Sequence, residues 1–195
     1  MGHSTDFGTK NLSLDFSNHP SNFLQVEARP TNFSAEPTTF LFTDGSVDTQ
    51  SKIGWGASLV VSSLNLSHAR LSKGIKTRCF EDTSSSKLEL QTILWALGEL
   101  KSSRVIAYSD SQNIVQLPAR RYRLEEQDYV SKSGKPLNHR ELYKELYKIS
   151  DQIDLEIRKV KGHAPGPQRD QIQEIFALVD KASRSALRAA TTRER

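Results

Sequence analysis

The chain has 195 residues, of which 36% are hydrophobic and 26% are charged, which allows one compact domain and an appendage but not a second full domain. Its single cysteine, Cys79, excludes an intramolecular disulfide. No segment has the apolar length of a membrane span or a signal sequence, so we expect a soluble, cytoplasmic protein. The formal charge of +4 only weakly favours polyanionic partners.

The first part of the chain lacks the pattern of a folded core. Residues 1–37 are rich in Asn, Ser and Thr, contain three prolines, and show neither the two-residue period of a strand nor the 3.6-residue period of a helix. We interpret them as an N-terminal extension, poorly structured or docked on the core. The sequence predicts a core domain over residues 38–190 and a basic tail over residues 191–195.

Three strand patterns follow the extension. The first covers residues 39–43, and we place Asp44 where that strand ends. The second covers residues 54–61 and the third roughly residues 67–77, and the short linkers predict an antiparallel meander. The glycines on both sides of Trp55 indicate a close backbone approach or a bulge, although ordinary hairpin flexibility explains them equally well.

Residues 84–101 show the clearest helical pattern in the chain. Serines supply an N-cap, and apolar side chains recur every three or four positions. This stripe consists of Leu90, Ile93, Leu94, Leu97 and Leu100. Glu89 borders the stripe near the helix N-terminus, where the helix dipole alone could explain a carboxylate, as could a functional site.

A further apolar strand, residues 104–109, also ends in a carboxylate, Asp110. Because the intervening helix forms a crossover, this strand should lie parallel to the first. If the two strands are neighbours, Asp44 and Asp110 emerge side by side. Glu89 comes from the helix between them, so three acids would share one cleft.

The second half of the chain contains two more predicted helices with a basic stretch between them. Residues 111–117 predict a short helix stopped by Pro118, and residues 139–150 a helix capped by Asn138. In the basic stretch, cations alternate with tyrosines at Arg120, Arg121, Tyr122, Arg123, Tyr129, Lys132 and Lys135. This composition favours a surface that tracks phosphates, although a solvated face has the same composition.

The last elements are a strand, a loop and a helix. Residues 153–160 predict the strand, and the Gly- and Pro-rich loop after it contains His163, which can exchange protons near neutral pH, although a lone loop histidine is usually only solvated. The final helix begins at Asp170, with Asp180 beside its apolar stripe. We expect its basic end, residues 184–195, to fray.

Four carboxylates therefore stand out by position: Asp44 and Asp110 at strand ends, Glu89 and Asp180 at the margins of helix stripes. Clustered acids without Cys or several His favour Mg²⁺ or Mn²⁺ over Zn²⁺. Two such ions would clamp the attacking and leaving oxygens of a phosphodiester, with a metal-bound water as nucleophile. The alternative is four unrelated surface acids.

Over roughly residues 38–187 the chain resembles type 1 ribonuclease H. The resemblance rests on five motifs in the family's order: Thr43-Asp44-Gly45-Ser46, Lys87-Leu88-Glu89-Leu90, Ser109-Asp110-Ser111-Gln112, Val160-Lys161-Gly162-His163-Ala164 and Asp180-Lys181-Ala182-Ser183-Arg184. It implies an α/β fold with a ribonuclease H-like mixed five-stranded sheet, three antiparallel strands plus two parallel, flanked by helices. It also implies metal-dependent endonucleolytic cleavage of the RNA strand of an RNA–DNA hybrid.

The resemblance also implies roles for single residues. The metal-binding acids would be Asp44, Glu89, Asp110 and Asp180, holding two Mg²⁺ ions with Mn²⁺ as an alternative, and His163 would assist proton transfer and product release. The candidates for substrate binding are Gly45, Ser46, Ser85, Ser86, Lys87 and Gln112. We expect an RNA–DNA hybrid as the partner, no membrane contact, no obligate protein partner and a monomeric state.

Two other functions stay open at this point. One is a nuclease of the same fold that acts on another substrate, such as double-stranded RNA or branched DNA. The other is a nucleic-acid-binding module that keeps the fold without catalysis. The four acids argue against the binding module, because clustered negative charge beside phosphates weakens binding.

Overall fold

The computed structural model describes residues 37–160 and 170–193, and its central element is a five-stranded sheet. The strands are β1 (Thr39–Asp48), β2 (Ile53–Val61), β3 (Lys76–Phe80), β4 (Arg104–Ser109) and β5 (Asp154–Lys159). Their order is β3-β2-β1-β4-β5; the β1–β2 and β2–β3 pairs are antiparallel and the β1–β4 and β4–β5 pairs are parallel. This confirms the predicted mixed sheet. The predicted extension, apart from Pro37, and His163 lie outside the described residues.

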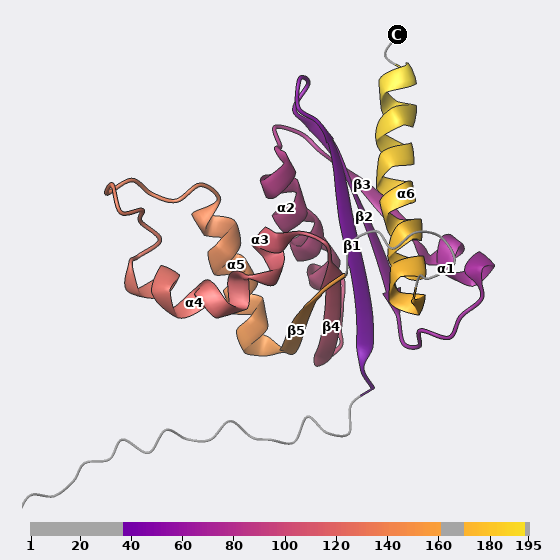
Figure 1. Cartoon of the computed structure of the whole chain (residues 1–195), viewed down its shortest axis with the longest axis horizontal. Coiled ribbons are helices and arrows are strands. Elements are labelled where there is room, and N and C mark those ends of the chain that lie inside the picture. Colours follow the sequence, from indigo (N-terminus) through magenta and orange to yellow (C-terminus); the bar gives the residue numbers. More distant parts are fainter. Residues whose placement is uncertain (1–36, 161–169, 194–195) are drawn as a thin grey trace, which may run out of the picture. The chain divides into compact units, whose positions relative to one another are not determined.

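Helices cover both faces of the sheet. They are α1 (His68–Gly74), α2 (Ser85–Gly98), α3 (Gln112–Val115), α4 (Leu117–Glu126), α5 (Arg140–Gln152) and α6 (Gln171–Arg193). Figure 1 shows α2 to α5 on one face and α1 with α6 on the other. The strands supply both cores by alternation: Val105 and Ala107 of β4 belong to the core on the side of α2 to α5, whereas Ile106 and Tyr108 face the α6 side. No helix in the described ranges is long and apolar enough to cross a membrane.

The predicted third strand, residues 67–77, is wrong over most of its length. Those residues form α1, and β3 begins only at Lys76. The Ser67 side chain caps α1 by accepting a hydrogen bond from the Arg70 amide at 3.4 Å, and Leu71 is buried in the core on the α6 side. A helix of this length with one buried residue has no distinct apolar period, which explains the error.

Two predicted helix boundaries also differ from the structure. Pro118 does not end a helix; α3 ends at Val115, and Pro118 lies in the first turn of α4, where a missing N–H costs nothing. The residue before α5 is His139, in a left-handed conformation with φ 63°, and not Asn138. The His139 side chain makes no capping bond within the described part of the chain.

The start of α6 is confirmed, but its predicted end is not. Asp170 Oδ1 accepts a hydrogen bond from the Gln173 amide at 2.8 Å, and Gln173 Oε1 accepts one from the Asp170 amide at 3.0 Å. The helix then continues to Arg193 instead of fraying from residue 184, and it passes the predicted domain boundary at residue 190. None of residues 184–192 is buried, so these turns extend past the core.

The glycines of β1 and β2 allow α2 to contact the strand backbones directly. A Cβ on Gly45 would lie 2.9 Å from Leu88 Cδ2, and one on Gly54 would lie 2.7 Å from the same atom. A Cβ on Gly56 would overlap the Thr92 hydroxyl. The close backbone approach predicted around Trp55 is therefore confirmed, and it sets the position of α2 over the sheet.

We expect Gly56→Ala to lower the free energy of unfolding by about 1–3 kcal/mol, because the new methyl group must displace Thr92 from a close-packed contact. The matched control is Gly98→Ala in the same helix–sheet layer. Apart from its chain neighbours and the backbone of its own helix, no described atom lies within 4 Å of the position its Cβ would take, so alanine should leave stability unchanged or raise it by up to about 1 kcal/mol. Urea unfolding of both variants measures the difference, and equal stability would contradict the packing argument.

Candidate active site

The candidate site lies where β1 and β4 stop pairing. Their parallel ladder ends with Phe42 opposite Tyr108, and Asp110 follows directly after β4. Asp44 does not end its strand as predicted, because β1 stays paired with β2 as far as Asp48. It lies instead just past the end of the parallel ladder.

Three of the four predicted acids meet at this point. A small pocket is lined by Thr43, Asp44, Glu89, Thr92, Ser109 and Asp110. These residues come from β1, α2 and the end of β4, the three elements that the crossover argument brings together. The structure thus places Asp44, Glu89 and Asp110 around one pocket, whereas their role in binding metal stays a prediction.

The fourth acid, Asp180, reaches Asp44 from α6. Its negative charge is one of the causes that raise the pKa of Asp44. One turn further along α6, Ser183 Oγ donates a hydrogen bond to Asp44 Oδ2 at 2.5 Å, and Arg184 Nη2 lies 2.6 Å from Asp180 Oδ1. Sequence reasoning missed the roles of Ser183 and Arg184, although both belong to the same motif as Asp180.

Glu89 also has a serine partner. Ser111 Oγ donates a hydrogen bond to Glu89 Oε2 and accepts one from the Ile114 amide, so Ser111 both caps α3 and holds the carboxylate. Burial raises the pKa of Glu89, the bond from Ser111 lowers it, and the charge of Asp110 raises it further. Ser111 was not predicted as a site residue; its place directly after Asp110 was the available signal.

The electrostatics of the site favour a bound cation. Burial raises the pKa of Asp44 to about 6, and the charges of Asp110 and Asp180 add to the rise, while bonds from Ser183 and the Gly45 amide oppose it. Carboxylate oxygens are the donors that Mg²⁺ and Mn²⁺ prefer, so the donor chemistry fits such an ion. Across residues 37–160 and 170–193, no group of three or more His, Cys, Asp or Glu side chains is already arranged to hold a metal ion.

The predicted substrate-binding residues lie at the starts of two helices and on one strand, and none of them is among the residues that line the pocket. Ser85, Ser86 and Lys87 form the first turn of α2, and both serines are exposed. Gln112 opens α3, and its Oε1 accepts a hydrogen bond from Lys159 Nζ at 2.5 Å.

The other substrate-binding candidates have partners of their own. Gly45 packs against Leu88, and Ser46 pairs with Trp55 across the β1–β2 ladder. Lys87 Nζ donates a hydrogen bond to the Asp82 carbonyl oxygen at 2.6 Å. These contacts make Gly45 a packing residue in the structure, whatever it does toward a substrate.

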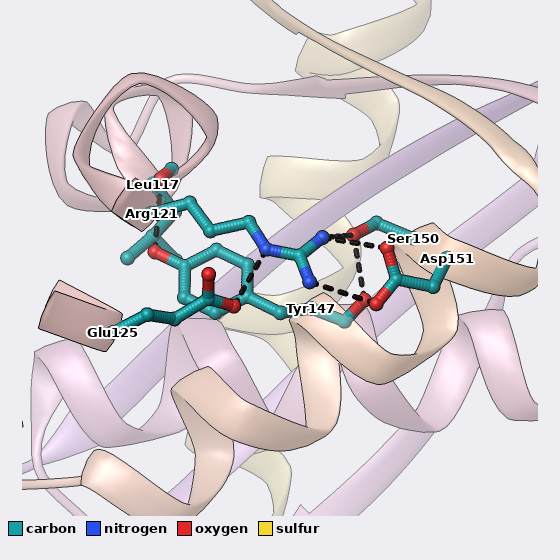
Figure 2. A network of polar contacts seen from close by, with 6 residues as sticks. All are labelled: Leu117, Arg121, Glu125, Tyr147, Ser150 and Asp151. Atoms are coloured by element: carbon teal, nitrogen blue, oxygen red, sulfur yellow. Dashed lines mark hydrogen bonds and ion pairs between the residues drawn. The ribbon is translucent and has the colours of Figure 1, made fainter. Parts of the chain in front are cut away.

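Part of the predicted phosphate-tracking stretch is a structural brace. Arg121 donates to both carboxylate oxygens of Asp151 at 2.7 Å and to Glu125 at 2.7 Å, and its guanidinium lies 5.2 Å from the Tyr147 ring centroid (Figure 2). The Tyr147 hydroxyl in turn donates to the Leu117 carbonyl at 2.9 Å, which joins α4 to α5.

The other residues of this stretch also include both buried and exposed side chains. Tyr129 is buried, with Lys144 Nζ 5.2 Å from its ring centroid, and therefore does not belong to a surface. Tyr122 is 77% exposed, and Arg123, Lys132 and Lys135 are exposed beside or beyond it. The exposed part of the stretch is thus smaller than the sequence predicts.

The fold is that of RNase H domains. It matches the solution structure of the PFV RNase H domain with a TM-score of 0.60 and 18% identity, over 75% of this chain and 92% of that one. It also matches a foamy viral protease-reverse transcriptase solved in complex with dsDNA, with a TM-score of 0.54 and 11% identity, over 76% of this chain and 95% of that one.

Sequence comparison agrees with the fold. The RNase H family model matches residues 36–180, and the chain belongs to this family of hydrolases. Ribonuclease H of Moorella thermoacetica is 28% identical over 141 residues, which cover 69% of this chain and 86% of that protein. Ribonuclease H of Chlorobaculum parvum is 26% identical over 150 residues, which cover 75% of this chain and 97% of that protein.

Asp44 should make the metal-free protein less stable as the pH rises. The folded-state pKa is about 6 and the ordinary value is 3.8, so between these values the folded protein holds a proton that the unfolded chain releases. Asp44→Asn removes this penalty. We expect the variant to exceed the wild type by about 1–3 kcal/mol above pH 6 and the difference to vanish near pH 4. Urea unfolding in EDTA across this range measures it; a constant difference would contradict the assigned pKa.

Arg121→Lys tests the brace between α4 and α5. Lysine keeps the charge but cannot bind both oxygens of Asp151, so we expect a loss of about 1 kcal/mol in the free energy of unfolding. Because Arg121 is already bound within the protein, the variant should bind nucleic acid with the affinity of the wild type. Arg123→Lys, at an exposed position of the same helix, is the control for stability. If Arg121→Lys weakened nucleic-acid binding without loss of stability, Arg121 would be a phosphate contact after all.

Proposed function

We propose that the protein is a divalent-metal-dependent endonuclease that hydrolyses the RNA strand of RNA–DNA hybrids. Membership of the RNase H family and relatives named ribonuclease H support this reaction. The observation that carries the proposal is the gathering of Asp44, Glu89 and Asp110 around one pocket, with Asp180 close enough to Asp44 to raise its pKa. Such a group of acids would repel a phosphate backbone unless a cation were bound between them.

The acids that would hold the metal are Asp44, Glu89, Asp110 and Asp180, with two Mg²⁺ ions as our expectation and Mn²⁺ as the alternative. Bound there, the ions would activate a water molecule and stabilise the charge on the phosphate. The protein's own part is orientation: Ser183 holds Asp44 and Ser111 holds Glu89, so neither carboxylate rotates freely. His163, which we expect to assist proton transfer, lies outside the described residues.

Selectivity for a hybrid requires that one strand be read through its 2′-hydroxyls. Ser85 and Ser86 are exposed at the start of α2, one turn before Glu89, and Gln112 is exposed two residues after Asp110. These three side chains, with Lys87 and the backbone of Gly45 and Ser46, are the proposed substrate contacts. A monomeric state, the absence of an obligate protein partner and a cytoplasmic location remain predictions.

The test is cleavage of a labelled RNA–DNA hybrid by the purified full chain in Mg²⁺. Asp110→Asn should lower kcat at least about a hundredfold, because loss of one ligand charge removes several kcal/mol of transition-state stabilisation. The matched control is Asp128→Asn, an exposed aspartate with φ 45° in the α4–α5 loop, a backbone conformation that asparagine also adopts readily.

Parallel assays on other substrates separate the alternatives. Preferred cleavage of double-stranded RNA or branched DNA would indicate a nuclease of the same fold with another substrate. Binding to nucleic acid without cleavage in any divalent metal would indicate a non-catalytic module. Either result would overturn the proposed function.

A further inference from the structure

We infer that Ser183 is a positioning residue for Asp44, and that its hydroxyl orients this carboxylate for a divalent cation. The inference rests on the proposed function, since it assigns Ser183 a role in the same site. Its basis is one hydrogen bond between α6 and β1, which joins Ser183 to Asp44 across 139 positions in the chain. Among the described residues, the hydrogen bonds of the Ser183 hydroxyl go to Asp44 and to the Asp180 backbone.

The geometry shows where the single proton of the Ser183 hydroxyl goes. Ser183 Oγ lies 2.5 Å from Asp44 Oδ2 and 2.9 Å from the Asp180 carbonyl oxygen, but a hydroxyl has only one hydrogen to donate. An ionised carboxylate is the stronger acceptor, and 2.5 Å is typical of a charged O–H···O⁻ bond. The proton therefore points at Asp44.

A serine at this position is costly unless its hydroxyl is used. Ser183 is 0% exposed and lies in the interior of a 23-residue helix, where alanine would be the better helix former. Burying a hydroxyl without a strong partner also costs free energy. The carboxylate of Asp44 is the partner that offsets both costs, and no packing argument requires the oxygen.

The effect on Asp44 is a fixed orientation. The negative charges of Asp110 and Asp180 both act on Asp44, and this repulsion gives its carboxylate no preferred orientation toward a cation. The bond to Ser183 fixes one oxygen on the α6 side, so the other lone pairs keep one direction. Glu89 is held in the same way by Ser111 from α3, so two acids of the site each have a serine from a different element.

The experiment compares three variants of the full chain after removal of metal: Ser183→Ala, Ser183→Thr and Ser185→Ala. Ser185 is an exposed serine on the same helix and serves as the matched control. Titration calorimetry with MgCl₂ and with MnCl₂, without nucleic acid, measures metal affinity directly. Urea unfolding in EDTA checks that each variant is folded.

We expect Ser183→Ala to weaken metal binding about 10- to 100-fold, the usual effect of removing a residue that orients a ligand. Ser183→Thr keeps the hydroxyl and should recover part of the affinity, and Ser185→Ala should match the wild type. On the hybrid, Ser183→Ala should lower kcat at limiting Mg²⁺ and leave KM for the hybrid unchanged. A merely structural role would lower stability without this pattern.

Two results would overturn the inference: a folded Ser183→Ala variant with the metal affinity of Ser185→Ala, or a wild-type protein that binds neither metal. If Ser183→Ala does not fold, Ser183→Cys takes its place, because a thiol has nearly the size of the hydroxyl but is only a weak donor. A 10- to 100-fold loss of metal affinity in Ser183→Cys supports the inference, and the metal affinity of Ser185→Ala overturns it. A wild type that binds Mg²⁺ but cleaves no hybrid would refute the proposed function alone, and the calorimetry would still decide the role of Ser183.

Discussion

The parallel ladder between β1 and β4 is short, and the rest of the structure depends on where it stops. Beyond Phe42 and Tyr108 the two strands separate. β1 continues beside β2, whereas the chain leaves the sheet after β4, at Asp110. This separation opens the edge at which Asp44 and Asp110 lie next to each other. The helix α2, which belongs to the crossover between these strands, packs on β1 and β2 and delivers Glu89 to the same place.

Opposing forces act on the acids gathered there. Burial and mutual repulsion favour their protonated forms, while hydroxyl donors favour the ionised forms. The donors, Ser111 and Ser183, are neutral and therefore do not cancel the charge that a cation would need. Asp180 has a cationic partner in Arg184, but that pair is partly exposed and therefore weak.

Much of the fold follows from local patterns in the sequence, and the differences arise where distant residues decide. The crossover argument identifies β1 and β4 as parallel neighbours, because it needs only the order of elements. The end of β1 could not be predicted, since its last residues depend on pairing with β2. Likewise α1 depends on burial of Leu71 by elements far along the chain.

The same limit applies to the candidate site. The acids are visible because each follows a strand or borders a helix stripe. Which acid each serine binds is not visible, since Ser183 meets Asp44 across 139 positions. For Arg121 the sequence suggests a role that the fold does not support. The composition of the stretch around it favours phosphate binding, but Asp151, 30 positions away, already binds it. Sequence patterns identify charged groups, whereas their partners depend on the tertiary fold.

The glycines under α2 have a consequence for the reach of a carboxylate. Glu89 follows Leu88, whose side chain lies against Gly45 and Gly54, so the depth of Glu89 in the pocket is determined by two positions that carry no side chain. A methyl group at Gly45 or Gly54 would displace the Leu88 side chain next to Glu89, and a shift of about 1 Å in a reacting group can cost about a hundredfold in rate. If Glu89 holds the proposed metal, glycines without functional groups help to determine turnover, and substitutions there would change activity without touching any acid.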